Sequence, residues 1–319
     1  MSATDDSDGG WVTDGDGGVL IGARNCTEPG PGDIVVRPEA TSLNRGEVRM
    51  LDRMPPGYVP GLDLVGRVVR SAADGSGPAV GARVMAMTGQ RGGGWGALSP
   101  IASDQVAVLP DSLADRTAAA LPTAGMTALR ALAWGGDLAG KRVLVTGATG
   151  GVGWLACQLA QAAGAIVSGT VSNVSRLPAI APLGLAAVYV GGTVTGNYEL
   201  IVETVGGAAL SEAMRVVAPD GVVTTLGGQE GFDAPDTPAT IPHGWFVLAP
   251  GAQLVALNVT HEVARLRTAA TDLSRLATLA ASGALDPGIG EVVHWGQLRE
   301  IVQRFQKGLV HGKAVAVRP

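Results

Sequence analysis

Apolar positions between Val19 and Pro110 form short runs that Gly and Pro residues interrupt. Such runs are typical of β-strands bounded by turns. They predict strands at Asp33–Arg37, Leu64–Val69, Arg83–Met87 and Gln105–Leu109. This part of the chain is therefore expected to be an all-β or mixed domain.

From about Thr117 the pattern changes to an alternation of helical and strand-like segments. Thr117–Leu132 has helical spacing with an interruption near Pro122, and further helices are expected at Ser175–Ala181 and Ala208–Val217. The predicted strands are Val143–Val145, Ile166–Val171, Ala186–Val190, Leu200–Val205, Val222–Leu226 and Gln253–Asn258. This alternation predicts an α/β fold with a doubly wound parallel sheet. Only Gly191–Tyr198 separates two of these strands, so one crossover helix is expected to be short or missing.

The last part of the chain exceeds what one such domain needs. It contains two helical patterns, His261–Ser282 and Gln297–Lys307, and a predicted strand, Lys313–Val317. We expect it to return to the first domain. Residues 1–18 are rich in Asp, Gly and Ser and predict a flexible, solvated tail. The expected division is thus 19–115 with 260–319 for one domain and 116–259 for the other.

Composition narrows the classes of partner. The chain has 319 residues and a net charge of −5, and it contains no Lys/Arg-rich run, so binding to nucleic acid or to a membrane surface is disfavoured. No apolar stretch approaches the ~20 residues of a spanning helix, and the first ten residues do not resemble a signal peptide. We therefore expect a cytoplasmic protein. Two cysteines, Cys26 and Cys157, argue against a disulfide framework.

The most informative segment is Val143–Gly153, VLVTGATGGVG. An apolar strand leads into a glycine turn, and an amphipathic helix follows. Glycine lets the backbone turn sharply and approach phosphates, whose charge is met by free N–H groups and the positive end of the helix dipole. Strand, turn and helix together predict a dinucleotide site. Its candidate residues are Gly147, Thr149, Gly150, Gly151, Val152 and Gly153.

Several motifs in a fixed order resemble the medium-chain dehydrogenase/reductases, in their zinc-independent quinone oxidoreductase branch. They are EPGPGDIVVRPEATSLN, VPGLDLVGRVV, GARVMAM, ALPTAGMTALRAL, VLVTGATGGVG, YELIVETVGGAAL and GKAVAVRP. The resemblance covers nearly the whole chain. It implies a β-rich, GroES-like catalytic domain, an inserted Rossmann domain, a cofactor cleft between them and commonly a homodimer. Enoyl reductase modules of polyketide and fatty-acid synthases are similar too.

Two neighbouring families are less similar. Short-chain dehydrogenases share the glycine pattern but place it near the start of the chain and use a Tyr-x-x-x-Lys pair, which none of the three tyrosines here forms. Zinc alcohol dehydrogenases carry a Gly-His-Glu motif where this chain has Gly61, Leu62 and Asp63. The four histidines are scattered and no cysteine cluster exists, so no metal site is expected.

The region after the second Rossmann strand indicates the cofactor. An acidic residue there would bind the 2′-hydroxyl of NAD, but residues 168–176 contain none. Ser172 and Arg176 can instead bind a 2′-phosphate, so NADPH is expected. A solvated surface role for Arg176 stays open. The resemblance adds Thr127 beside the nicotinamide, and the ends of later strands add Thr204, Val205, Gly206, Leu226 and Gly227.

The expected chemistry is hydride delivery to a quinone or to the C=C bond of an enone or enoyl thioester. Donors aimed at the substrate oxygen would stabilise the developing charge. By resemblance Asn44 is the candidate contact, although a turn-capping role is equally open. Related quinone reductases often have a Tyr where this chain has Arg49, which leaves the proton donor open; Arg49 could bind an enolate or an anionic group, and Tyr58 could line the cleft.

Three functions remain open at this point. The first is a metal-free NADPH-dependent quinone or enone reductase, the second a trans-acting enoyl reductase of a polyketide-like pathway, and the third an NADPH-binding sensor or structural protein with little turnover. The substrate would be a small molecule or thioester with a conjugated carbonyl. Residues 228–245 could cover the substrate or form a surface excursion. Homodimerisation is expected, with Gln253–Asn258 at the sheet edge as the candidate contact.

Overall fold

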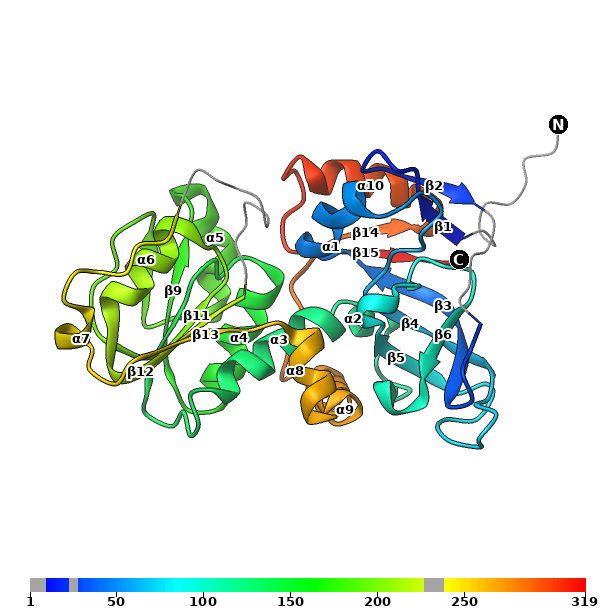
Figure 1. Ribbon diagram of the computed structural model, residues 1–319, viewed down its shortest axis with the longest axis horizontal. Helices are drawn as coiled ribbons and strands as arrows, with labels where there is room; N and C mark the ends of the chain where they lie inside the picture. The colour runs from blue at the N-terminus through cyan, green and yellow to red at the C-terminus, as the bar shows by residue number, and fades with distance from the viewer. Residues whose placement is uncertain (1–9, 23–27, 227–237) are drawn as a thin grey trace. The chain divides into compact units, whose positions relative to one another are not determined.

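A computed structural model of the chain describes residues 10–22, 28–226 and 238–319. The chain divides into two compact units (Figure 1). Unit 1 consists of Met1–Met126 and Val263–Pro319, and unit 2 is the continuous segment Thr127–Glu262. Helices α3 (Pro122–Ala133) and α8 (Val259–Leu266) run across the two points where the chain passes between units.

Unit 2 contains a six-stranded parallel sheet in the order β10-β9-β8-β11-β12-β13. Its strands are β8 (Arg142–Val145), β9 (Ile166–Val171), β10 (Ala187–Val190), β11 (Tyr198–Glu203), β12 (Val217–Thr225) and β13 (Gln253–Ala256). Its helices are α4 (Gly151–Ala162), η5 (Val174–Arg176), α5 (Leu177–Ile180), η6 (Ala181–Leu183), α6 (Gly207–Val216) and α7 (Trp245–Leu248). The strand order reverses between β8 and β11, which is the switch point where doubly wound sheets bind ligands.

The connection from β10 to β11 contains no helix, as the short spacing predicted. The two strands are separated by β9 and β8, which corresponds to about 14 Å at the usual strand spacing. Because the strands are parallel, the connection must also return to the opposite end of the sheet, and the eight steps from Val190 to Tyr198 can span about 28 Å when extended, which suffices without a helix.

Unit 1 contains a seven-stranded sheet in the order β14-β15-β3-β4-β5-β7, with β6 paired to β3, and a separate hairpin β1-β2. Its strands are β1 (Gly10–Thr13), β2 (Val19–Gly22), β3 (Asp33–Ser42), β4 (Asp63–Arg70), β5 (Arg83–Met87), β6 (Ser99–Ala102), β7 (Val106–Val108), β14 (Ile289–His294) and β15 (Lys313–Val317). Its helices are α1 (Arg45–Met50), η2 (Leu51–Arg53), η3 (Gly89–Arg91), η4 (Ser103–Gln105), α2 (Asp115–Ala119), α9 (Ala269–Ala281), η7 (Trp295–Gln297) and α10 (Leu298–Gln306). The fold class is therefore the predicted one, a β-rich part and a part with a doubly wound parallel sheet.

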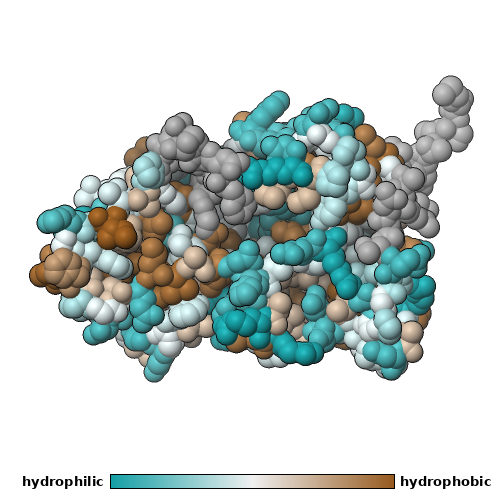
Figure 2. Space-filling model, viewed as in Figure 1, coloured by the Kyte–Doolittle hydropathy of each residue, from teal (hydrophilic) through white to brown (hydrophobic). Residues whose placement is uncertain are grey.

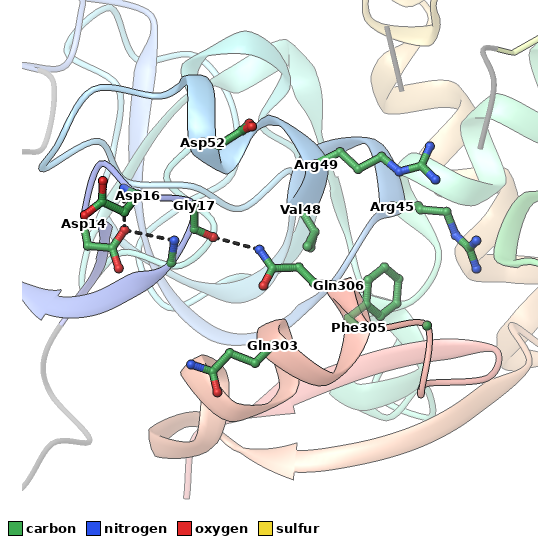
Figure 3. A pocket seen from close by; sticks show the side chains of 12 residues that line it. Asp14, Asp16, Gly17, Arg45, Val48, Arg49, Asp52, Gln303, Phe305 and Gln306 are labelled. Carbon is green, nitrogen blue, oxygen red and sulfur yellow. Dashed lines mark hydrogen bonds between the residues drawn. The ribbon is translucent and has the colours of Figure 1, made fainter. Parts of the chain in front are cut away.

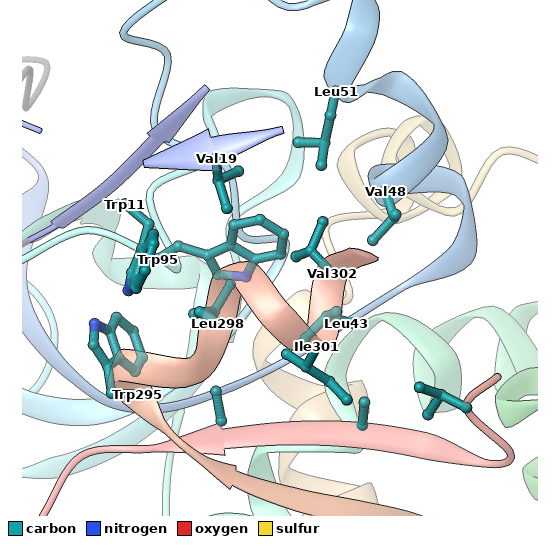
Figure 4. Close-up of a cluster of buried hydrophobic side chains, with 13 residues drawn as sticks. Trp11, Val19, Leu43, Val48, Leu51, Trp95, Trp295, Leu298, Ile301 and Val302 are labelled. Atoms are coloured by element: carbon teal, nitrogen blue, oxygen red, sulfur yellow. The ribbon is translucent and has the colours of Figure 1, made fainter. Parts of the chain in front are cut away.

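Two expectations about unit 1 need correction. Residues 10–13, expected in a solvated tail, form the buried strand β1, because Trp11 enters the core with α10 (Figure 4). Residues 1–9 lie outside the described residues. The predicted helix His261–Ser282 is two helices, α8 and α9, and Arg267 between them has a φ of 54°.

The core between the hairpin, α1 and α10 is unusually aromatic (Figure 4). Trp11, Trp95 and Trp295 are all buried there, and the guanidinium of Arg318 lies 4.1 Å from the ring centre of Trp295. This core holds α1 in place, and with it Asn44, the residue that directly precedes the helix. Among the described residues, no helix combines the length and apolar character that crossing a bilayer requires.

Candidate functional site

A buried polar cluster surrounds the carboxylate of Asp63, the first residue of β4. Its Oδ2 accepts hydrogen bonds from Ser42 Oγ at 2.5 Å and from Asn44 Nδ2 at 2.8 Å. Lys313 Nζ lies 3.3 Å from the same oxygen, and both side chains are almost completely buried. Oδ1 accepts from the backbone N–H of Thr123 at 2.8 Å. A buried carboxylate needs such donors, so Asp63 ties β3, β4, β15 and the start of α3 together.

Asn44 is partly exposed at the edge of this cluster and precedes α1. Its side chain does not cap the helix, so the turn-capping alternative is wrong. Its Oδ1 accepts from Lys313 Nζ at 2.8 Å while its Nδ2 donates to Asp63. Because an ammonium only donates and a carboxylate only accepts, the amide can hold just one orientation.

Glu47, one turn further along α1, is buried on the same side. Its Oε1 accepts from the backbone N–H groups of Gly61 and Leu62 at 2.7 and 2.6 Å. Its Oε2 is buried and has no hydrogen-bond partner within the described part of the chain. Burial, together with the nearby Asp63 carboxylate, raises the pKa of Glu47 to about 8. Glu47 therefore holds the loop before Asp63 and retains a proton at neutral pH.

The other two predicted catalytic residues lie away from these contacts. Arg49 lines an open cavity on another face of α1 (Figure 3). The hydroxyl of Tyr58 is 3.4 Å from the backbone carbonyl of Gln90, and burial, followed by the charge of Glu47, raises the pKa of Tyr58. The structure thus places only Asn44 in the polar cluster, and Asp63, Glu47 and Lys313 are residues that the sequence did not single out.

In unit 2 the predicted glycine turn joins β8 to α4. Gly147 has a φ of 61°, which favours glycine, and its N–H lies 3.2 Å from Thr170 Oγ1. Gly150 precedes α4, and Gly151, Val152 and Gly153 form the first helical turn, with Thr149 partly exposed before it. A Cβ on Gly153 would lie 2.5 Å from the carbonyl oxygen of Gly147. Only glycine fits this close approach, which leaves the N-terminal N–H groups of a three-turn helix for a phosphate.

Glu203, at the end of β11, organises the facing loop and was also missed. Its buried Oε1 accepts from Thr146 Oγ1 at 3.0 Å and from the N–H groups of Val205 and Gly206 at 2.8 and 2.9 Å. Oε2 accepts from Thr225 Oγ1 at 3.2 Å. One carboxylate therefore joins the ends of β8, β11 and β12 at the switch point. The one signal in the sequence is an acidic residue directly after the apolar run Leu200–Val202.

The remaining predicted cofactor residues also lie at strand ends, apart from Thr127. Thr204 donates its N–H and its hydroxyl to Thr146 Oγ1 and to the Thr146 carbonyl, both at 2.8 Å. Ser172 is exposed and Arg176 half-buried after β9, and Leu226 follows β12. Thr127 is buried on α3. Gly227 and most of the 228–245 loop lie outside the described residues.

Comparisons with known proteins agree with this architecture. Residues 30–111 match the family model of the alcohol dehydrogenase GroES-like domain, and residues 186–315 match that of the zinc-binding dehydrogenases. The chain is 36% identical over 179 residues to the chloroplastic quinone-oxidoreductase QR1 of Triphysaria versicolor, covering 50% of this chain and 54% of that protein. Both matched domains are dehydrogenase domains, and together with the likeness to quinone oxidoreductases they support the predicted assignment to the medium-chain dehydrogenase/reductases and their quinone oxidoreductase branch.

Two further proteins extend the comparison. A phenolphthiocerol/phthiocerol polyketide synthase of Mycobacterium tuberculosis is 28% identical over 287 residues, 88% of this chain but 12% of that protein. An oxidoreductase from Salmonella enterica in complex with NADP has a TM-score of 0.77 at 22% identity, covering 97% of this chain and 99% of that one. The chain spans about half the length of its plant quinone reductase relatives and a small part of the synthases.

The name of the second family model raises the question of zinc. Leu62 cannot ligate a metal, and the carboxylate of Asp63 is surrounded by the donors of Ser42, Asn44 and Lys313. An ammonium occupies the position next to the carboxylate that a cation would need. Among the described residues, no group of three or more His, Cys, Asp or Glu side chains could hold a metal. The side chains at this position therefore do not fit a zinc ion.

Proposed function

We propose that this protein is a metal-free, NADPH-dependent reductase of a quinone or of a C=C bond conjugated to a carbonyl. The observation that carries the proposal is the fixed amide of Asn44. An amide has two N–H donors, and Asp63 takes one of them. Since Lys313 binds the oxygen and Asp63 takes one N–H, the second N–H of Asn44 is the group left to donate to a ligand.

A preorganised donor is what reduction of a conjugated carbonyl requires. Negative charge develops on the carbonyl oxygen when the remote carbon is reduced, and a donor fixed in advance stabilises it without reorganisation. In this proposal Asn44 binds that oxygen, and Asp63 and Lys313 hold the amide in place. NADPH, when bound, supplies the hydride.

The residues of unit 2 fit the proposed cofactor. The first turn of α4 and the close Gly147–Gly153 approach suit the pyrophosphate, and Thr204 lies at the switch point. We propose that Ser172 and Arg176 bind the 2′-phosphate. Replacing Arg176 by Ala should then raise the KM for NADPH more than that for NADH, whereas equal changes would remove Arg176 from the site.

NADPH oxidation by purified, chelator-treated protein tests the reaction. Suitable acceptors are 1,4-benzoquinone, 9,10-phenanthrenequinone, 2-cyclohexenone, crotonyl-CoA and a simple aldehyde. Turnover with a quinone or enone, reduced about 100-fold in kcat by Asn44→Ala, supports the proposal. NADPH binding without turnover would favour a sensor, and activity lost on chelation would overturn the metal-free assignment.

A trans-acting enoyl reductase is the second candidate because part of a polyketide synthase aligns with 88% of this chain. It predicts turnover with crotonyl-CoA or another enoyl thioester and little with quinones. The same panel distinguishes the two, since the acceptors share the conjugated carbonyl and differ in the group attached to it.

We further propose that the protein forms a homodimer through the edge strand β13. Leu254 on this strand is 43% exposed, and the nearby α7 exposes Phe246, Val247 and Leu248 by 80, 66 and 63%. Figure 2 shows hydrophobic surface at the position of α7. An edge strand beside an apolar patch favours pairing with a second copy.

A further inference from the structure

A cavity of about 550 Å³ opens on unit 1 along one face of α1 (Figure 3). The 14–18 loop, one face of α1 and the end of α10 form its walls. Val48 and Phe305 contribute apolar surface, and charged side chains surround them. Its volume lies in the range of small-molecule sites.

The positively and negatively charged side chains of this cavity lie in different parts of it. Arg45 and Arg49 are four residues apart on α1 and therefore share one face of the helix. Figure 3 shows both guanidinium groups extending away from Asp14 and Asp16. Both arginines also interact with other groups of the chain, but each guanidinium has five N–H donors and can serve an anion in addition.

The two arginines also stand close in the sequence to Asn44, the proposed catalytic contact. Arg45 is the residue after Asn44, and Arg49 lies about 6 Å further along the helix axis. A substrate whose carbonyl contacts Asn44 must therefore reach around the start of α1 to bring an anionic group to the two guanidiniums.

We propose that Arg45 and Arg49 bind an anionic group of the substrate, a carboxylate or a phosphate. This inference rests on the proposed function. Guanidinium groups bind both oxyanions through paired hydrogen bonds. The carboxylates of Asp14, Asp16 and Asp52 in the same cavity disfavour a polyanion, so the site accepts one anionic group.

Pairs of acceptors that differ only in charge test this site. The first pair is trans-4-oxo-2-pentenoate and its methyl ester, and the second is crotonyl-phosphopantetheine and crotonyl-pantetheine. The anionic member should have a KM at least about fivefold lower, and the difference should shrink as salt is raised. An advantage confined to the first pair identifies a small carboxylic acid, and one confined to the second identifies the phosphate of a carrier arm.

Variants assign the effect to the cavity. The double variant Arg45→Gln/Arg49→Gln should bring the KM ratio of the sensitive pair to within about twofold. Arg53→Gln is the matched control, because Arg53 is exposed in η2 and is not among the residues lining the cavity, and it should keep the wild-type ratio. Equal KM values within both pairs, with turnover intact, would overturn the anion site alone. No turnover with any acceptor, including neutral 2-cyclohexenone, would instead overturn the proposed function.

Discussion

The ammonium of Lys313 lies 2.8 Å from the amide oxygen of Asn44, although 269 positions separate the two residues in the sequence. The same ammonium also donates to Asp63 Oδ2 and to the backbone carbonyl of Leu43, so three buried or half-buried polar groups depend on one side chain. Lys313 and Asp63 together therefore fix the orientation of the Asn44 amide. Lys313 lies on β15, and Asn44 follows β3. Because these two strands are paired, the sheet itself brings the ammonium next to the amide of the proposed catalytic donor.

Replacing Lys313 by Met should destabilise unit 1 strongly. The change leaves the Asp63 charge buried without its cation, which typically costs about 3–5 kcal/mol. Urea unfolding measures the loss. Lys307→Met is the matched control, because Lys307 is exposed after α10 and should change stability by less than about 0.5 kcal/mol. The double variant Asp63→Asn/Lys313→Met should recover part of the loss, and a loss below about 1 kcal/mol in the single variant would contradict the buried pair.

The buried carboxyl of Glu47 should make stability depend on pH. Its pKa is about 8 in the folded protein and near 4.5 when unfolded, so between these values the folded state holds an extra proton. Stability due to this group is complete below about pH 4.5 and is lost as pH rises through about 8. The decline should approach about 1.4 kcal/mol per pH unit within that window.

Glu47→Gln isolates this contribution because glutamine resembles the neutral acid and does not titrate. Urea unfolding at several pH values should give a shallower decline for the variant. The exposed Glu300→Gln on α10 serves as the control and should follow the wild type. Parallel curves for wild type and Glu47→Gln would show that Glu47 is ionised in the folded protein.

Replacing Glu203 by Ala should weaken NADPH binding. The N–H groups of Val205 and Gly206 would lose their acceptor, at about 1–3 kcal/mol for each group left unpaired. The loop at the switch point would then lose its conformation, and we expect the Kd for NADPH to rise about tenfold or more. Glu199→Ala, on the same strand in a surface pair with Arg142, should leave the Kd unchanged. A similar Kd in both variants would remove Glu203 from the support of the site.

The proposed dimer predicts a change in mass on substitution at the sheet edge. Leu254→Glu places a charge on β13 and should convert a dimer to a monomer in analytical ultracentrifugation at micromolar concentration. Leu309→Glu is the control, since Leu309 is 59% exposed in unit 1. A wild-type protein that sediments as a monomer would contradict the dimer directly.

Local sequence patterns predicted the helices and strands better than the residues of the candidate functional site. The predicted strands Arg83–Met87, Ile166–Val171 and Lys313–Val317 agree with the observed ones residue for residue, because short and mostly buried stretches of this kind suit strands. Ile289–His294 was missed although it alternates between partly buried and exposed positions, and β1 was missed because Trp11 stands among Asp and Gly residues. Resemblance pointed to Asn44, but its partners come from distant segments: 250 positions separate Lys313 from Asp63, and no spacing rule connects them.

The discontinuous path of the chain through unit 1 has a consequence for its biogenesis. Unit 2 is one uninterrupted stretch and can fold during translation as soon as it leaves the ribosome. Unit 1 must wait, because β3 lacks its β15 neighbour and Asp63 lacks its ammonium until residue 313 has been synthesised. During that interval the half-built sheet exposes an open edge and an uncompensated carboxylate, so chaperone binding to nascent chains should concentrate on the segment before residue 126.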